Sequence, residues 1–352
     1  MDTLISPRRR TVLQALGAAS LLAACGDRRG AAVAPVQEFR GATMGSTYTV
    51  KVADAGLSPA AATALREAVD AALSAVDQSM SAYRPESELS RFNAAAGTRP
   101  FALSPDTHAV FRLARDVSEA TGGAFDITVA PVVDAWGFGP GRVERVVGAS
   151  EIGILEARVG WQMLAVGDDG AVTKARPDLR ADLSGIAKGY GVDRAAQAIE
   201  AAGVANYMVE AGGEVRARGR NGEGRPWQIA IERPDAGPQR PHYIVPLAGM
   251  SMATSGDYRI FFERDGRRYC HEIDPGTGAP IANGLASVSV VAADCGYADA
   301  MATALIVLGT ERGLALAEAR GLAAFFIERS ANGRFNEHAS RAFAALGGRP
   351  VA

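Results

Sequence analysis

The stretch from Asp182 to Asp193 reads Asp-Leu-Ser-Gly-Ile-Ala-Lys-Gly-Tyr-Gly-Val-Asp. An acidic residue and a short turn lead into a pattern typical of a helix, with Lys188 in its first turns. Short side chains let backbone amides approach an anion, and a helix N-terminus favours negative charge. The stretch therefore predicts a phosphate ligand, although a glycine-rich turn with a surface lysine would have the same sequence. Gly185 and Lys188 are only three residues apart, which differs from the spacing of a Walker phosphate loop.

The composition predicts a folded chain with a sizeable core. It has 352 residues, of which 48% are hydrophobic, enough for one large domain or two. A formal net charge of -2 gives no electrostatic basis for nucleic-acid binding. The order of expected strands and helices lacks a strict βαβ rhythm. This order favours an α+β fold with mixed, largely antiparallel sheets and packed helices.

The first residues predict an export signal. Arg8-Arg9-Arg10 precede an apolar run, Val12 to Ala24, that is too short to span a bilayer. Its end, Leu22-Ala23-Ala24-Cys25, resembles a lipoprotein cleavage box, and the arginines fit a twin-arginine start. We expect a signal peptide over residues 1–24, a lipidated tether over 25–38 anchored through Cys25, and a folded domain over 39–352. An ordinary secretory signal with an incidental cysteine is the alternative. The protein is then expected on the periplasmic side of a bacterial membrane, inner or outer.

Local patterns predict several elements of the domain. Ser58-Pro59 is a good helix start, and one face of the helix that follows is apolar. Asp265-Gly266 predicts a hairpin turn, residues 124–129 a short strand, and residues 298–308 a buried helix. Residues 80–93 are polar and turn-rich, which predicts a functional loop. The apolar helix face expected in the core consists of Leu65, Val69, Leu73, Val76 and Met80.

Asp299 and Thr303 are four residues apart on the expected helix and so lie on one face. A carboxylate and a hydroxyl are hard oxygen ligands of the kind that magnesium accepts, usually together with substrate phosphates. An aspartate placed by the helix dipole and a packing threonine would give the same pattern.

His271 is one of four histidines and is expected on the second strand of the hairpin, just before a polar turn. Its ordinary pKa lies near neutral pH, so a general base is one interpretation and a hydrogen-bonded structural histidine is the other. Cys270 and Cys295 are expected to be free thiols.

Taken together, these segments resemble the ApbE family, the FAD:protein FMN transferases. The resemblance covers nearly all of residues 39–352, and seven matching segments occur in the family's order. They are Met44-Gly45-Ser46, Met80 to Tyr83 with Ser87 to Ser90, Gly123 to Thr128, Asp182 to Asp193, Ala253 to Arg259, His271 to Pro275 and Ala298 to Thr303.

The resemblance implies an FAD site and a magnesium site. Magnesium would be held by Asp299, Thr303 and the backbone carbonyl of Gly185. Tyr83 would stack on the flavin or cap it, Lys188 would add positive charge at the pyrophosphate, and His271 is the candidate base. The family's FAD contacts correspond here to Met44, Tyr83, Ala124, Phe125, Asp126, Asp182, Lys188 and Ile273.

The reaction implied is magnesium-dependent transfer of FMN from FAD to a threonine or serine hydroxyl of a target flavoprotein, with release of AMP. The expected target is a subunit of a membrane or exported redox complex. An FAD pyrophosphatase and a non-catalytic FAD-binding carrier are the alternatives. Two residues depart from the family's pattern. Ser46 replaces a threonine, and Glu210 replaces an asparagine, so Glu210 is expected to face away from the ligand or to reach magnesium through water.

Overall fold

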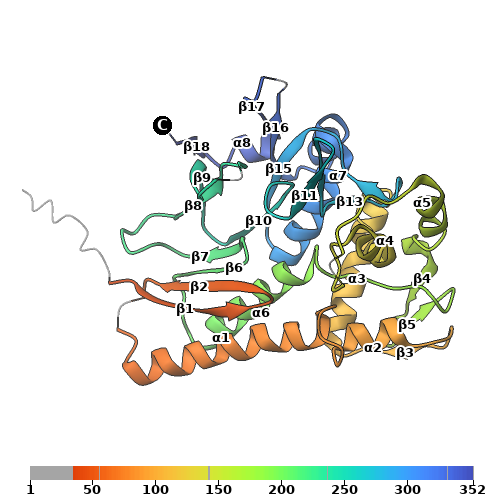
Figure 1. Ribbon diagram of the computed structural model, residues 1–352. Helices are drawn as coiled ribbons and strands as arrows, with labels where there is room; N and C mark the ends of the chain where they lie inside the picture. Colours follow the sequence, from red (N-terminus) through yellow and green to blue (C-terminus); the bar gives the residue numbers. More distant parts are fainter. Residues whose placement is uncertain (1–34, 55, 142, 236, 331, 352) are drawn as a thin grey trace, which may run out of the picture. The chain divides into compact units, whose positions relative to one another are not determined.

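An antiparallel sheet forms the centre of the fold (Figure 1). Among the described residues every strand pair is antiparallel, and eight strands join in the order β1-β2-β6-β7-β10-β15-β16-β17. These strands are β1 (Gln37–Thr43), β2 (Ser46–Val52), β6 (Tyr207–Ala211), β7 (Glu214–Arg218), β10 (Met250–Gly256), β15 (Leu285–Ala292), β16 (Ala323–Arg329) and β17 (Phe335–Ala339).

The computed structural model describes residues 35–54, 56–141, 143–235, 237–330 and 332–351. The predicted signal peptide, the lipidation site Cys25 and most of the predicted tether lie outside these residues. All described residues belong to one compact unit, Ala34–Ala352.

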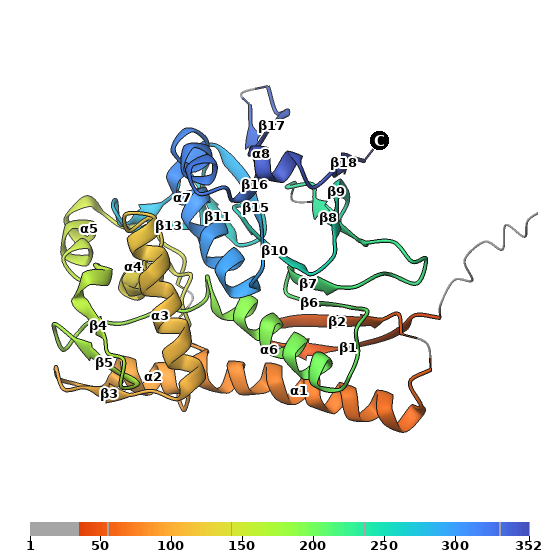
Figure 2. The ribbon, with the colours of Figure 1, turned by 180° about the vertical axis from the view of Figure 1, so that it is seen from behind.

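Three long helices cover one face of the sheet (Figure 2). They are α1 (Pro59–Met80), α6 (Ala187–Ala201) and α7 (Cys295–Ala319). Helix α6 packs against α1 and α7, and α7 packs on β10 and β15. The predicted apolar face of α1 is confirmed, because the five residues named above are its buried residues. Because α6 packs on α7, the residues around Gly185 and Lys188 lie next to Asp299 and Thr303 of α7.

A smaller sheet covers the opposite face. Its order is β18-β9-β8, and α8 (Arg341–Ala344) packs beside it on β16. Val215 and Ala217 of β7 belong to this second core, so the alternate residue Glu214 faces the helices instead. The strands are β8 (Trp227–Glu232), β9 (Pro241–Leu247) and β18 (Arg349–Pro350).

The remaining elements form a region beside α7 (Figure 1). Its helices are α2 (Glu88–Ala94), α3 (Pro105–Ala120), the 3₁₀ turn η1 (Ile127–Val129), α4 (Ala130–Trp136), α5 (Ala149–Glu156) and η2 (Trp161–Met163). Its strands are β3 (Phe101–Ala102), β4 (Leu164–Val166), β5 (Ala171–Lys174), β11 (Phe261–Arg264), β12 (Arg267–Cys270), β13 (Ile273–Asp274) and β14 (Ala279–Pro280).

Three local predictions are wrong. Residues 124–129 do not form a strand: the carboxylate of Asp126 accepts the N–H of Thr128 at 2.8 Å, which caps the 3₁₀ turn η1. Residues 80–93 are not all loop, because Ser87 caps the short helix α2. His271 follows β12 instead of lying within it, although its N–H still bonds to the carbonyl of Ile260 at 3.1 Å. The hairpin itself is confirmed.

Helix α7 is the one helix of the described residues that is long and apolar enough to cross a membrane. Its position against β10, β15 and α6 identifies it as a core helix. Its backbone is not helical at Gly309, where φ is 79° and a kink separates two helical segments, so the predicted buried helix over residues 298–308 lies within the first segment.

Candidate functional site

The turn before α6 places the residues that the sequence singled out. The carboxylate of Asp182 accepts both the N–H and the hydroxyl of Ser184, at 2.8 and 2.5 Å, and so closes the turn. The sequence predicted that the amides here would approach a phosphate. The structure gives two of them protein partners, since the N–H of Ala187 bonds to Leu183 and that of Gly189 to Asp299. The anion at this helix start is therefore the chain's own aspartate.

Asp299 and Thr303 face the same turn from α7. A Cβ added to Gly185 would lie 3.1 Å from the hydroxyl of Thr303 and 3.3 Å from the ring of Phe125. The backbone at Gly185 thus lies close to the Thr303 hydroxyl, the group that the sequence paired with it. The same hydroxyl hydrogen-bonds to Ser255 of β10 at 3.0 Å. Oδ2 of Asp299 accepts the N–H of Gly189 at 2.9 Å, which leaves Oδ1 directed toward Lys188.

Asp299 is buried, at 3% exposed. Burial raises the pKa of its carboxyl, and the nearby Lys188 ammonium opposes that rise. A buried carboxylate needs a positive partner, so the position favours a cation. Within the described residues no group of three or more His, Cys, Asp and Glu side chains could hold a metal. A metal here would instead use one carboxylate together with hydroxyl and carbonyl oxygens, a donor set that suits magnesium.

Lys188 lies between two carboxylates. Its Nζ is 2.5 Å from Oε1 of Glu214 and 3.8 Å from Oδ1 of Asp299. Burial disfavours the charge of Lys188, but Asp299 and Glu214 together raise its pKa above the ordinary value. The lysine therefore stays positive at neutral pH, as a phosphate ligand requires.

Asp193, at the end of the same stretch, fixes α7 against α6. Its Oδ1 accepts the N–H of Cys295 at 3.0 Å, and its Oδ2 accepts that of Gly296 at 2.9 Å. Arg216 of β7 donates to the same carboxylate at 2.7 Å. Asp193 thus caps α7 from a neighbouring helix and sets the register that brings Asp299 to Lys188.

His271 stands beside a second buried acid. Its Nε2 is 3.6 Å from Oε1 of Glu272, and its buried Nδ1 has no hydrogen-bond partner among the described residues. Burial raises the pKa of Glu272, while His271 and Lys188 oppose that rise. The Glu272 carboxyl therefore lies within electrostatic reach of both His271 and the Lys188 and Asp299 cluster.

The other predicted contacts lie around this centre. Tyr83 is 53% exposed, and its hydroxyl donates to the carbonyl of Phe138 at 3.1 Å. Met44 packs on α6, where a Cβ at Gly191 would lie 3.0 Å from its methyl. Ile273 is buried in a separate apolar cluster with Trp136.

The segment of Ala124, Phe125 and Asp126 approaches the site through the ring of Phe125, which lies close to Gly185. The N–H of Asp182 bonds to the carbonyl of Ile127 at 2.7 Å. The carboxylate of Asp126 is already used, because it accepts from Thr128 and from the N–H of Trp161 at 2.8 Å. It therefore shapes the loop and has no free oxygen directed at a ligand.

The structure adds residues that the sequence did not single out. Glu214 and Ser255 contact Lys188 and Thr303, and Asn93 bonds to both backbone groups of Ala181, beside Asp182. Glu214 begins strand β7 directly after the pair Gly212-Gly213. An acidic residue next to a glycine turn is a pattern from which a site residue could have been predicted.

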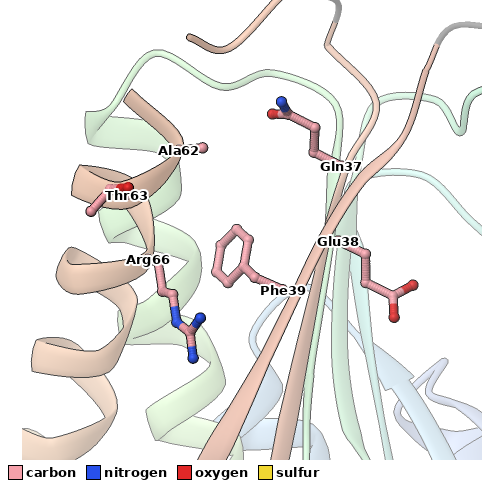
Figure 3. Close-up of a pocket in the computed structure, with 6 residues that line it drawn as sticks. All are labelled: Gln37, Glu38, Phe39, Ala62, Thr63 and Arg66. Atoms are coloured by element: carbon pink, nitrogen blue, oxygen red, sulfur yellow. The ribbon is translucent and has the colours of Figure 1, made fainter. Parts of the chain in front are cut away.

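Two surface hollows lie on the described part of the molecule, and the second of them is lined in part by Asn93. One, of about 320 Å³, lies between β1 and α1 (Figure 3). The other, of about 250 Å³, includes Ala82 and Arg180, which are near Tyr83 and Asp182 in sequence. The first is lined by Gln37, Glu38, Phe39, Ala62, Thr63 and Arg66, none of which belongs to the site.

The arrangement of a buried aspartate, a threonine and a lysine around a glycine turn agrees with the family that the sequence resembles. The profile of that family, the ApbE family, matches residues 44–326. This chain belongs to the ApbE family. The FAD:protein FMN transferase of Haemophilus influenzae is 43% identical to it over 317 residues, which are 88% of this chain and 91% of that protein. The enzyme of the same name from Vibrio cholerae is 42% identical over 338 residues, 95% and 98% of the two chains.

The flavin transferase ApbE of Vibrio cholerae has the same fold. Its structure superposes with a TM-score of 0.81 at 41% identity and covers 89% of this chain and 100% of its own. The α+β class, the family and the enzyme class predicted from the sequence are therefore confirmed. The free state of Cys270 and Cys295 is confirmed as well, and both are buried. Glu210 bonds to the N–H of Gly213 at 2.9 Å, so it closes the glycine turn beside Glu214.

Proposed function

We propose that this ApbE-family chain transfers FMN from FAD to a threonine or serine hydroxyl of a target flavoprotein and releases AMP. The observation that carries the proposal is the meeting of Gly185, Lys188, Asp299 and Thr303 between α6 and α7. A lysine and an oxygen-ligand set in one place are what a pyrophosphate substrate requires.

The residues fit a magnesium ion. Oδ1 of Asp299, the hydroxyl of Thr303 and the carbonyl of Gly185 are the oxygens that would hold it. The tight approach of Gly185 to Thr303 supports this, since any larger residue would put a Cβ against the hydroxyl. Magnesium bound there would neutralise negative charge on the pyrophosphate and the departing phosphate.

The chain's own side chains provide positioning and proton transfer. Lys188 would hold the pyrophosphate by its charge. The hydroxyl oxygen of the target attacks the FMN-side phosphorus, a new P–O bond forms, and the P–O bond to AMP breaks. The hydroxyl proton passes to the imidazole of His271. Within the part of the chain that the structure describes, its buried Nδ1 has no hydrogen-bond partner, and its Nε2 lies beside Glu272.

The flavin end of FAD is assigned to the surface near Tyr83. The ring is half-exposed and its hydroxyl is anchored to the carbonyl of Phe138, so its exposed surface can stack on a planar ligand. Met44, Ile273, Asp182 and the segment 124–126 are the other proposed FAD contacts, and the ring of Phe125 lies close to Gly185. Since the carboxylate of Asp126 is occupied, this segment would contact FAD through its backbone.

The expected cellular place is the periplasmic side of a bacterial membrane, with Cys25 lipidated. This rests on the sequence of residues 1–25. A membrane-anchored enzyme would meet flavoprotein subunits of membrane or exported redox complexes, which are the proposed targets.

The test uses the purified full-length chain with FAD, magnesium and a flavoprotein acceptor domain that carries a reactive threonine. Fluorescence in a denaturing gel reports covalently bound flavin. The proposal predicts a fluorescent acceptor, and none when that threonine is replaced by alanine. FMN and AMP free in solution would instead identify a pyrophosphatase, and FAD bound but unchanged would identify a carrier.

A further inference from the structure

Glu214 is a buried acid next to the site, and the mechanism above gives it no role. It is 1% exposed and accepts from Lys188 at 2.5 Å, while its second oxygen is buried without a hydrogen-bond partner among the described residues. It begins β7 and points to the helix side of the sheet. Burial of a glutamate to this extent requires a positive partner, and among the described residues the side-chain partner of Glu214 is the Lys188 ammonium.

The Lys188 ammonium can pair with either of two carboxylates, Glu214 or Asp299. Its Nζ lies 2.5 Å from Glu214 and 3.8 Å from Oδ1 of Asp299. The other oxygen of Asp299 already accepts the N–H of Gly189. Oδ1 is therefore the oxygen that remains for a cation, and it is the same oxygen that Lys188 would pair with if Glu214 released it.

We propose that Glu214 is a positioning residue that holds the Lys188 ammonium away from Asp299 and so keeps Oδ1 of Asp299 free for a divalent cation. The inference rests on the cation site given under the proposed function. It assigns Glu214 no contact with substrate, and its effect reaches the cation only through the lysine.

The glycine turn before Glu214 leaves room for the ion pair of Glu214 and Lys188. A Cβ at Gly212 would lie 3.3 Å from Oε2 of Glu214 and 3.4 Å from Cδ of Lys188, and the φ of Gly212 is +65°. A side chain there would strain the backbone and press on both partners. Glu210 bonds to Gly213 and holds the same turn closed.

The test measures Mn²⁺ binding to the full-length chain by electron paramagnetic resonance, without FAD. Glu214→Ala is expected to weaken binding by about 10–100-fold, the usual effect of losing a residue that supports a ligand. The double variant Glu214→Ala/Lys188→Met is expected to bind at least as tightly as the natural chain, since no ammonium then competes for Asp299. Glu318→Ala, which removes an ion-paired glutamate at the far end of α7, is the matched control and should not change binding.

Two results would overturn the inference. One is Glu214→Ala binding Mn²⁺ as tightly as the natural chain. The other is a double variant that binds as weakly as Glu214→Ala, because Glu214 would then not act through Lys188. If Glu214→Ala does not fold, Glu214→Gln replaces it in both comparisons; the neutral side chain holds the ammonium less firmly, so a smaller loss, again reversed by Lys188→Met, is expected.

Separate measurements test the cation site and the flavin-transfer activity. A natural chain that binds no Mn²⁺, or Asp299→Ala that binds it equally well, would reject the site and the role of Glu214 with it. Covalent labelling of the acceptor domain is measured separately and decides the transferase activity.

Discussion

Gly189 is a point of close approach between α6 and α7, and its replacement by alanine should separate the helices that make the site. A Cβ at this position would lie 2.7 Å from the carbonyl carbon of Cys295 and 2.8 Å from the Cβ of Asp299, with the Cys295 oxygen closer still. Backbone cannot rotate out of the way as a flexible side chain can. The alanine therefore has to push α7 away and weaken the bond from the N–H of Gly189 to Asp299.

The expected magnitude follows from three contributions. Overpacking costs about 1–3 kcal/mol, and a weakened hydrogen bond to a charged group costs about 1.5–3 kcal/mol. Alanine regains about 1 kcal/mol through its higher helix propensity. Gly189→Ala should thus lower the free energy of unfolding by about 1.5–5 kcal/mol. It should also weaken Mn²⁺ binding, since α7 carries Asp299 and Thr303.

Urea unfolding followed by circular dichroism measures this change. Gly153→Ala is the matched control: Gly153 is in α5, and a Cβ there meets nothing within 4 Å. That variant should gain about 0.5–1 kcal/mol of stability. The packing argument is refuted if Gly189→Ala unfolds within about 0.5 kcal/mol of the natural chain, the range of an ordinary surface substitution.

Three further variants separate the remaining roles. Asp299→Ala should abolish magnesium-dependent flavin transfer while the far-ultraviolet circular dichroism stays unchanged, and full activity with magnesium would remove Asp299 from the site. His271→Ala should slow transfer by about 10²–10⁴-fold with little change in the FAD dissociation constant; equal losses in rate and affinity would make it a binding residue. Cys25→Ser should move the protein from the membrane fraction to the soluble fraction, whereas unchanged fractionation would argue against lipidation.

Much of the fold could be predicted from local sequence. The apolar face of α1 and the Asp265-Gly266 hairpin are decided within one helix and one turn, so periodicity and turn chemistry were sufficient. The segment 124–129 shows the limit of such reasoning. Its β-branched residues favour a strand, but the Asp126 carboxylate bonds to Thr128 and Trp161 and makes a 3₁₀ turn instead.

The candidate site was partly predictable in the same sense. Asp299 and Thr303 share a helix face by their spacing, and their meeting with Gly185 came from the family resemblance. The role of Glu214 could not be predicted, because it depends on Lys188, a residue 26 positions earlier, and on which face of β7 meets the helices. The use of the Gly189 amide by Asp299 is likewise a contact between distant segments, 110 residues apart.

The stoichiometry of the reaction tests the central claim most directly. The purified full-length chain is mixed with FAD, magnesium and the threonine-bearing acceptor domain, and intact mass and released AMP are followed over the same time course. The account predicts one AMP for each acceptor that gains the mass of FMN less one water, and neither product with Asp299→Ala. AMP released without a modified acceptor, or a modified acceptor without AMP, would contradict it.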